Sequence, residues 1–321
     1  MNILEVANLS KKYNDFTAVK DVAFSVEEDE IFGFLGPNGA GKTTTINMII
    51  GLARPTSGSI TLAGIDCVKN TKLAQRVMGI VPDESNLYDD MNGFENLCFC
   101  ASLYGMGKMQ REKKARELLL EFDLGKTGDR PFKAYSKGMK RKLTIAAGII
   151  HEPKMLFMDE PTTGIDVESA KQIRELVTGL KRRGTTIFLT THYIEDAQRL
   201  CDRIAFIVDG RIVKIAPVNE LLKNSQAARH IVHFVLNGSA AAFDDELKKH
   251  FPDYNFEEQD GICVCYAHQP FSILPLVSFF EEKGLSVYEA KSVYPSLEDV
   301  FVKITGIEAK KLAKEKEGGR K

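Results

Sequence analysis

A glycine-rich stretch from Gly36 to Thr44 lies near the start of this 321-residue chain and limits the folds that are open to it. Gly36 and Gly41 bracket four residues and precede Lys42 and Thr43, the phosphate-loop pattern, between a strand-like run and a helix-like segment. Glycines let backbone N–H groups point at phosphate oxygens, and a helix N-terminus adds partial positive charge. We therefore predict a nucleotide-binding loop made of Gly36, Pro37, Asn38, Gly39, Ala40, Gly41, Lys42, Thr43 and Thr44.

Two carboxylates follow an apolar strand-like run at 155–158. At the C-terminal end of such a strand, where open α/β sheets bind ligands, Asp159 suits Mg²⁺ and Glu160 can polarise the water that attacks a γ-phosphate. Alone, an Asp-Glu pair is equally compatible with a strand cap, but its place downstream of a phosphate loop favours catalysis. A third strand-like run at 186–190 leads to His192, a candidate γ-phosphate contact once the other two motifs are accepted.

Strand-like and helix-like segments alternate along most of the chain, which indicates an α/β layer fold. Apolar residues at helical spacing indicate an all-helical insert at about 86–150, and the pattern resets after Ala216. The predicted fold class is an α/β P-loop NTPase core with this insert and a small α+β C-terminal domain. The predicted domains are residues 1–224, residues 225–306 with a βαββαβ-like order, and a charged tail at 307–321.

Composition narrows the function classes further. Hydrophobic residues make up 44% and charged residues 27%, as in soluble globular proteins, and the net charge of −1 gives no field that would attract nucleic acid, so no nucleic-acid partner is expected. No apolar run approaches the roughly 18 residues of a spanning helix, and the N-terminus lacks a leader pattern. Six scattered cysteines indicate reduced thiols, with metal binding by the Cys-x-Cys pairs the less favoured alternative. We expect a cytosolic chain.

A short segment before the helix-like run at 140–150 carries a family resemblance. Tyr135-Ser-Lys-Gly-Met139 resembles the Leu-Ser-Gly-Gly-Gln signature of ABC ATPases: Ser136 and Gly138 match, whereas Lys137 and Met139 differ. The Tyr-Ser-Lys-Gly-Met form is similar to the variant in ATPase subunits of drug, antibiotic and sodium exporters. The segment at 295–301 also resembles part of the extra C-terminal domain of that subgroup.

The resemblance implies roles for further residues. Tyr13 would stack on adenine, Pro161 to Asp166 would be the D-loop, and His192 the switch histidine. Two ATPase domains of this family pair head to tail, so the signature of one (Ser136, Lys137, Gly138 and Met139) would cover the ATP bound to the other. A homodimer would have two complete sites; pairing with a related subunit stays open.

The implied function is the ATP-binding and hydrolysing subunit of an ABC transporter of the exporter kind, with ATP and Mg²⁺ bound. A separate transmembrane permease would contact the insert around 86–105 and hold the chain on the inner face of the cell membrane. The alternative is a soluble ABC ATPase that acts on ribosomes or nucleic acid. Such proteins usually carry two ATPase domains or a long coiled-coil insertion, and this sequence shows neither.

One position departs from the family pattern. Asp83 stands after Gly79-Ile-Val-Pro82, where the family usually has Gln. Its carboxylate can offer oxygen to Mg²⁺ beside Thr43 and Asp159, but it adds negative charge near the phosphates. The assignment of Asp83 as a metal ligand therefore stays open.

Overall fold

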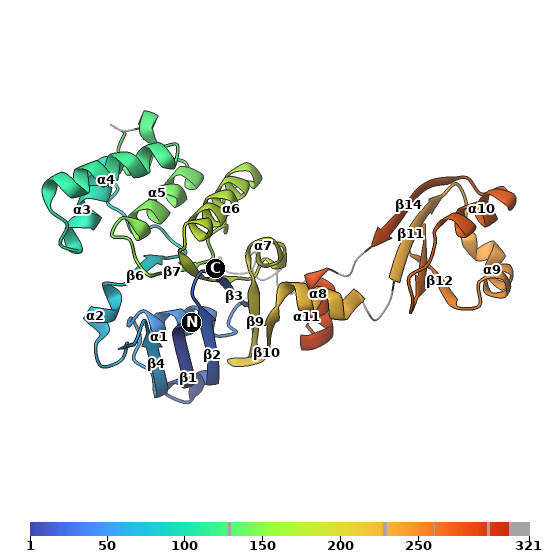
Figure 1. Cartoon of the computed structure of the whole chain (residues 1–321), viewed down its shortest axis with the longest axis horizontal. Coiled ribbons are helices and arrows are strands. Elements are labelled where there is room, and N and C mark those ends of the chain that lie inside the picture. Colours follow the sequence, from blue (N-terminus) through green and yellow to red (C-terminus); the bar gives the residue numbers. More distant parts are fainter. Residues whose placement is uncertain (128–129, 227–229, 260, 294–295, 308–321) are drawn as a thin grey trace. The chain divides into compact units, whose positions relative to one another are not determined.

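The computed structural model describes residues 1–127, 130–226, 230–259, 261–293 and 296–307. The chain divides into two compact units: Val218–Lys303 form unit 2, and Met1–Pro217 together with the described residues from Ile304 onward form unit 1 (Figure 1). The predicted boundary at 224/225 falls inside the helix α8 (Val218–Gln226). Residues 308–321 of the predicted charged tail lie outside the described residues.

Unit 1 contains two sheets. The smaller is antiparallel with strand order β2-β1-β4-β5, and the larger has the order β10-β9-β3-β8-β7-β6, parallel except for β10. The strands are β1 (Asn2–Tyr13), β2 (Phe16–Glu27), β3 (Ile31–Leu35), β4 (Ser57–Leu62), β5 (Ile65–Asp66), β6 (Met78–Val81), β7 (Met155–Asp159), β8 (Thr186–Thr191), β9 (Arg203–Val208) and β10 (Arg211–Pro217). Sequence patterning did not foresee β4, β5 and β10: several residues of β4 and β10 are exposed, and β5 is only two residues long.

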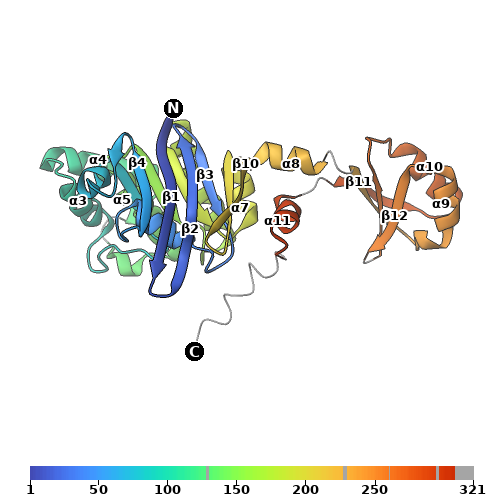
Figure 2. The same ribbon diagram turned by 90° about the horizontal axis from the view of Figure 1, so that it is seen from below.

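The helices of unit 1 follow the predicted alternation, and α3, α4 and α5 of the helical insert lie together in both views (Figures 1 and 2). They are α1 (Lys42–Ile49), α2 (Thr71–Gln75), α3 (Gly93–Leu103), α4 (Lys108–Glu121), α5 (Lys137–Ile149), α6 (Val167–Arg182) and α7 (Ile194–Leu200), with short 3₁₀ turns at Gly125–Thr127 and Phe132–Ala134. In the part of the chain that the structure describes, no helix is both long and apolar enough to span a membrane.

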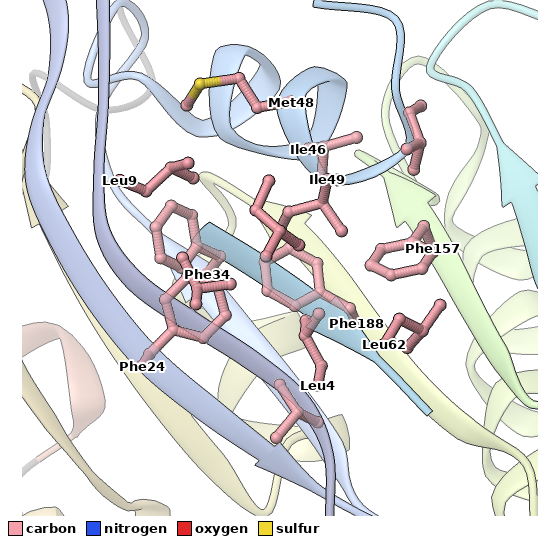
Figure 3. Close-up of a cluster of buried hydrophobic side chains, with 14 of the residues drawn as sticks. Leu4, Leu9, Phe24, Phe34, Ile46, Met48, Ile49, Leu62, Phe157 and Phe188 are labelled. Carbon is pink, nitrogen blue, oxygen red and sulfur yellow. The ribbon is translucent and has the colours of Figure 1, made fainter. Parts of the chain in front are cut away.

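The core of unit 1 lies between α1 and the two sheets (Figure 3). Phe24, Phe34 and Phe188, from β2, β3 and β8, are in mutual contact with ring centroids 5.6 to 5.8 Å apart. Ile46 and Ile49 of α1 pack in the same cluster, and both are almost fully buried. Such close packing allows little adjustment, so the C-terminal ends of β3 and β8 are held in register beside the start of α1.

Unit 2 has the βαββαβ order that the sequence predicts, with an antiparallel sheet of order β12-β13-β11-β14. Figures 1 and 2 show α9 and α10 on one face of it. The elements are β11 (His230–Leu236), a 3₁₀ turn (Ala240–Phe243), α9 (Asp244–His250), β12 (Tyr254–Gln259), β13 (Ile262–Ala267), α10 (Leu274–Glu282), β14 (Val287–Val293) and α11 (Leu297–Thr305). Phe234, Leu276 and Phe280 centre a separate core, in which Cys263 and Cys265 are free, buried thiols.

Candidate active site

The glycine-rich loop joins the end of β3 to the start of α1, as predicted. A Cβ on Gly36 would lie 2.2 Å from the carbonyl oxygen of Ile207, and Gly41 has φ of 102° with a Cβ position 2.7 Å from the carbonyl oxygen of Ala18. Both positions therefore require glycine. No side chain caps α1 at Gly41, so its first-turn N–H groups are available to an anion.

Lys42 and Thr43 open α1 and point toward the end of β7. The buried Lys42 Nζ donates to the carbonyl oxygens of Gly36 at 2.8 Å and Pro37 at 3.2 Å, and it lies 3.5 Å from Glu160 Oε1. Thr43 Oγ1 donates to Asp159 Oδ2 at 3.1 Å. The structure thus brings the phosphate loop and the two predicted carboxylates together at one edge of the sheet.

A threonine that the sequence reasoning missed organises both carboxylates. The hydroxyl of Thr190, on β8, donates to Asp159 Oδ1. The backbone nitrogen of Glu160 lies 3.1 Å from the carbonyl oxygen of Thr190 and 3.3 Å from its hydroxyl oxygen, and its N–H donates toward both. Glu160 has φ of 48°, an uncommon conformation that this pairing supports. The available signal in the sequence was only a Thr directly after the apolar run 187–189.

His192 contacts the predicted base directly. Its Nδ1 lies 2.7 Å from Glu160 Oε2, which also accepts a hydrogen bond from Thr163 Oγ1 at 3.1 Å. Burial by itself raises the pKa of Glu160, but the close contact with His192, the charge of Lys42 and the hydrogen bond from Thr163 together hold that pKa below its ordinary value. Glu160 is therefore ionised at neutral pH, as a residue that polarises water must be.

The signature residues lie at the N-terminus of α5. Ser136 caps this helix by accepting a hydrogen bond from the Met139 N–H at 3.2 Å, and both Ser136 and Lys137 are exposed. A Cβ on Gly138 would lie 2.3 Å from Ser169 Oγ, so α5 approaches α6 closely at this point. Asp166 caps α6 by accepting from the Ser169 N–H at 2.9 Å and hydroxyl at 2.7 Å. The predicted signature and the predicted D-loop are thus neighbours.

Two further residues predicted for the site, Tyr13 and Asp83, contact residues other than those described above. Tyr13 ends β1 as a residue that is 47% exposed, and Lys11 Nζ lies 4.8 Å from the centroid of its ring. This exposure is compatible with stacking on a planar base. Asp83 follows β6 with a half-exposed side chain, and its Oδ1 lies 3.7 Å from a guanidinium nitrogen of Arg141.

Comparison with known proteins identifies relatives along nearly the whole chain. Residues 19–163 match the family model described as ABC transporter. The linearmycin resistance ATP-binding protein of Bacillus subtilis is 35% identical over 95% of this chain and 98% of its own length. The bacitracin transport ATP-binding protein of Bacillus licheniformis is 34% identical over 95% of this chain and 97% of its own.

Solved structures match the ATPase part of the fold. The ATP-binding subunit of an ABC transporter superposes with a TM-score of 0.63 at 32% identity, covering 69% of this chain and 92% of its own. A dimeric ATP-binding cassette in a post-hydrolysis state with ADP and Pi gives a TM-score of 0.61 at 25% identity, covering 67% and 98%. The predicted fold class is therefore confirmed.

Proposed function

Because this chain belongs to the family of ABC transporter ATP-binding subunits and hydrolyses ATP as its members do, we propose that it drives export through a separate transmembrane subunit. The observation that carries the proposal is the convergence of Lys42, Thr43, Asp159, Glu160 and His192 at the C-terminal edge of one sheet. In a transporter, these residues would hydrolyse the ATP that drives transport.

In the proposed hydrolysis step, Lys42 and the α1 N-terminus hold the phosphates, and His192 contacts the γ-phosphate. The Glu160 carboxylate accepts a hydrogen bond from the attacking water and orients it. The Thr43 hydroxyl and Asp159 carboxylate, 3.1 Å apart, offer the oxygen donors that suit a small hard cation, so these two would hold Mg²⁺. Bound there, Mg²⁺ would neutralise charge that develops on the phosphates.

We propose that two copies close head to tail on ATP. The N-terminus of α5 presents Ser136 and Lys137 to solvent, where a γ-phosphate on a second copy could bind. The neighbouring Asp166 would then lie near the same interface. A dimeric relative with ADP and Pi supports such pairing, and because this chain carries every motif, a homodimer is the proposed form.

The helical insert is the proposed contact for the membrane subunit, which would place the chain on the cytoplasmic face of the membrane. Tyr88, Leu103 and Tyr104, at and beside α3, expose 53%, 70% and 39% of their surfaces. Apolar side chains in such a group favour a protein partner. Names of relatives that concern linearmycin resistance, bacitracin transport and Nod factor export support an exporter, whereas none supports the alternative on ribosomes or nucleic acid.

The test is a pull-down of tagged Glu160→Gln protein, with ATP and Mg²⁺, from detergent-solubilised membranes of the native host. A polytopic membrane protein at stoichiometric amount is the expected companion. Adding Leu103→Asp should remove it, whereas Leu274→Asp, at a residue of unit 2 with 71% exposure, should not. Recovery of the ATPase alone, or of ribosomes, would contradict the proposed coupling to a membrane subunit.

A further inference from the structure

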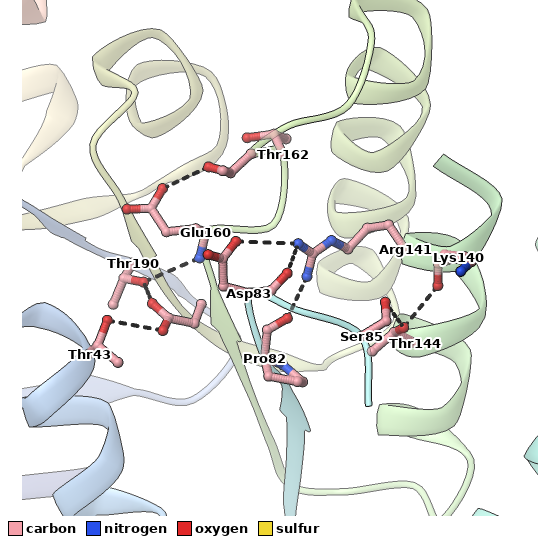
Figure 4. Close-up of polar contacts among 12 residues, drawn as sticks. Thr43, Pro82, Asp83, Ser85, Lys140, Arg141, Thr144, Glu160, Thr162 and Thr190 are labelled. Carbon is pink, nitrogen blue, oxygen red and sulfur yellow. Dashed lines mark hydrogen bonds and ion pairs between the residues drawn. The ribbon is translucent and has the colours of Figure 1, made fainter. Parts of the chain in front are cut away.

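A buried arginine outside the predicted site, Arg141, binds the backbone of the segment that carries Asp83. Arg141, on α5, is only 5% exposed. Its Nη1 donates to the carbonyl oxygen of Pro82 at 2.5 Å, and its Nη2 donates to the carbonyl oxygen of Asp83. The same Nη2 lies 3.7 Å from Asp83 Oδ1 (Figure 4). One guanidinium therefore holds two successive backbone carbonyls and also faces the carboxylate.

A second side chain of α5 holds the same segment. Thr144, three residues after Arg141 and thus on the same helix face, donates its hydroxyl to the Lys140 carbonyl oxygen at 2.8 Å. The Ser85 hydroxyl, 2.8 Å from Thr144 Oγ1, must then be the donor in that pair. Residues 82–85 are consequently fixed to α5 at both ends.

The backbones of β6 and α5 also meet directly before this segment. A Cβ on Gly79 would lie 2.3 Å from the carbonyl oxygen of Gly148. Because nothing larger than glycine fits there, β6 and α5 are packed backbone against backbone, and a shift of α5 would displace the segment after β6. The N-terminus of α5 is the signature that would contact the ATP of a second copy, so the helix connects that contact with Asp83.

The charge of Arg141 acts on the catalytic carboxylates as well. Burial lowers the pKa of Arg141, and the charges of Asp83, Asp159 and Glu160 act in the opposite direction, so all three lie within electrostatic reach. Arginine nevertheless stays protonated in proteins. Its positive charge can therefore balance the carboxylate that Asp83 introduces where the family usually carries a neutral amide.

We propose that Arg141 is a positioning residue for ATP hydrolysis, which ties Pro82 and Asp83 to the signature helix and neutralises the Asp83 carboxylate. The inference rests on the proposed ATP site and adds two separable effects. The charge balance acts on ATP binding, since an uncompensated carboxylate would repel the phosphates. The hydrogen bonds to the two carbonyl oxygens act on the geometry of the catalytic step.

The test is steady-state ATPase kinetics of the full chain with Arg141→Gln, Asp83→Asn and the double variant. Arg141→Gln should raise the KM for ATP about 10-fold, and adding Asp83→Asn should return it to within about 2-fold of wild type. The kcat should stay low in the double variant because the donors to Pro82 and Asp83 are still missing. An equal rise in KM in the single and double variants would overturn the charge balance.

Conservative and neighbouring variants separate positioning from mere stability. Arg141→Lys keeps the charge but lacks the fork of donors, so the KM should stay near wild type while kcat falls. Lys142→Gln, at the next residue, should change neither. Loss of thermal stability with unchanged KM and kcat in the Arg141 variants would overturn the proposal. Normal turnover by Glu160→Gln would refute the ATP site itself, a separate outcome.

Discussion

His192 Nδ1 lies 2.7 Å from Glu160 Oε2, so the residue after β8 holds the carboxylate that follows β7. This contact, with the nearby Lys42, outweighs the effect of burial and keeps the pKa of Glu160 below its ordinary value. In the proposed hydrolysis step, Glu160 fixed in this way would be ionised and oriented before it meets the attacking water.

The contact predicts a pH effect. In wild type, the pKa of Glu160 lies below its ordinary value, so its protonation does not limit the rate near neutral pH. His192→Leu removes the close contact and the charge that lower this pKa, while burial, which raises it, remains. The acid limb of kcat should therefore move to higher pH. Profiles of the two proteins between about pH 5 and pH 8 test this, and superimposable acid limbs would contradict it.

Thr190→Val should impair catalysis without unfolding the chain. The substitution keeps the shape of the side chain but removes the hydroxyl that bonds Asp159 and approaches the Glu160 N–H. We expect kcat to fall by about 10-fold or more, since one hydrogen bond to a charged group is worth roughly 1.5–3 kcal/mol. Thr186→Val, at the opposite end of β8, is the matched control and should leave kcat unchanged. Equal kcat in both variants would exclude the role of Thr190.

Site residues that belong to local sequence motifs could be predicted from the sequence. Site residues whose partners are distant in sequence could not. The phosphate loop, Asp159 and Glu160 follow from local patterns of strand, turn and helix. Thr190 and Arg141 act through partners 31 and 58 residues away, and no local spacing reveals such pairs. Burial on both faces made β3, β7 and β8 easy to recognise, whereas β10 is mostly exposed at the edge of the sheet.

Two glycines with different surroundings predict opposite effects on stability. A Cβ on Gly79 would lie 2.3 Å from a backbone oxygen of α5, whereas one on Gly179 in α6 would meet nothing within 4 Å. Gly79→Ala should therefore lower the free energy of unfolding by about 1–3 kcal/mol. Gly179→Ala should raise it by about 0.5–1 kcal/mol, because alanine favours the helix. Urea denaturation measures both, and a stable Gly79→Ala protein would contradict the close contact of β6 with α5.

Unit 2 should fold in isolation. Its core of Phe234, Leu276 and Phe280 is separate from that of unit 1, and its sheet is complete within residues 230–293. A fragment of residues 218–306 should show mixed helix and strand signals by circular dichroism and a cooperative thermal transition. A non-cooperative transition would mean that unit 2 depends on the rest of the chain.

The most direct test of the account is the turnover of Glu160→Gln protein. Replacing the carboxylate with an amide removes the group that polarises the attacking water but leaves Lys42 and Thr43 to hold nucleotide. We predict that ATP hydrolysis falls by about 100-fold or more while ATP binding persists. Glu168→Gln, in the first turn of α6, should hydrolyse ATP at the wild-type rate. Turnover of Glu160→Gln equal to that of wild type would contradict the assignment of Glu160 as the catalytic base.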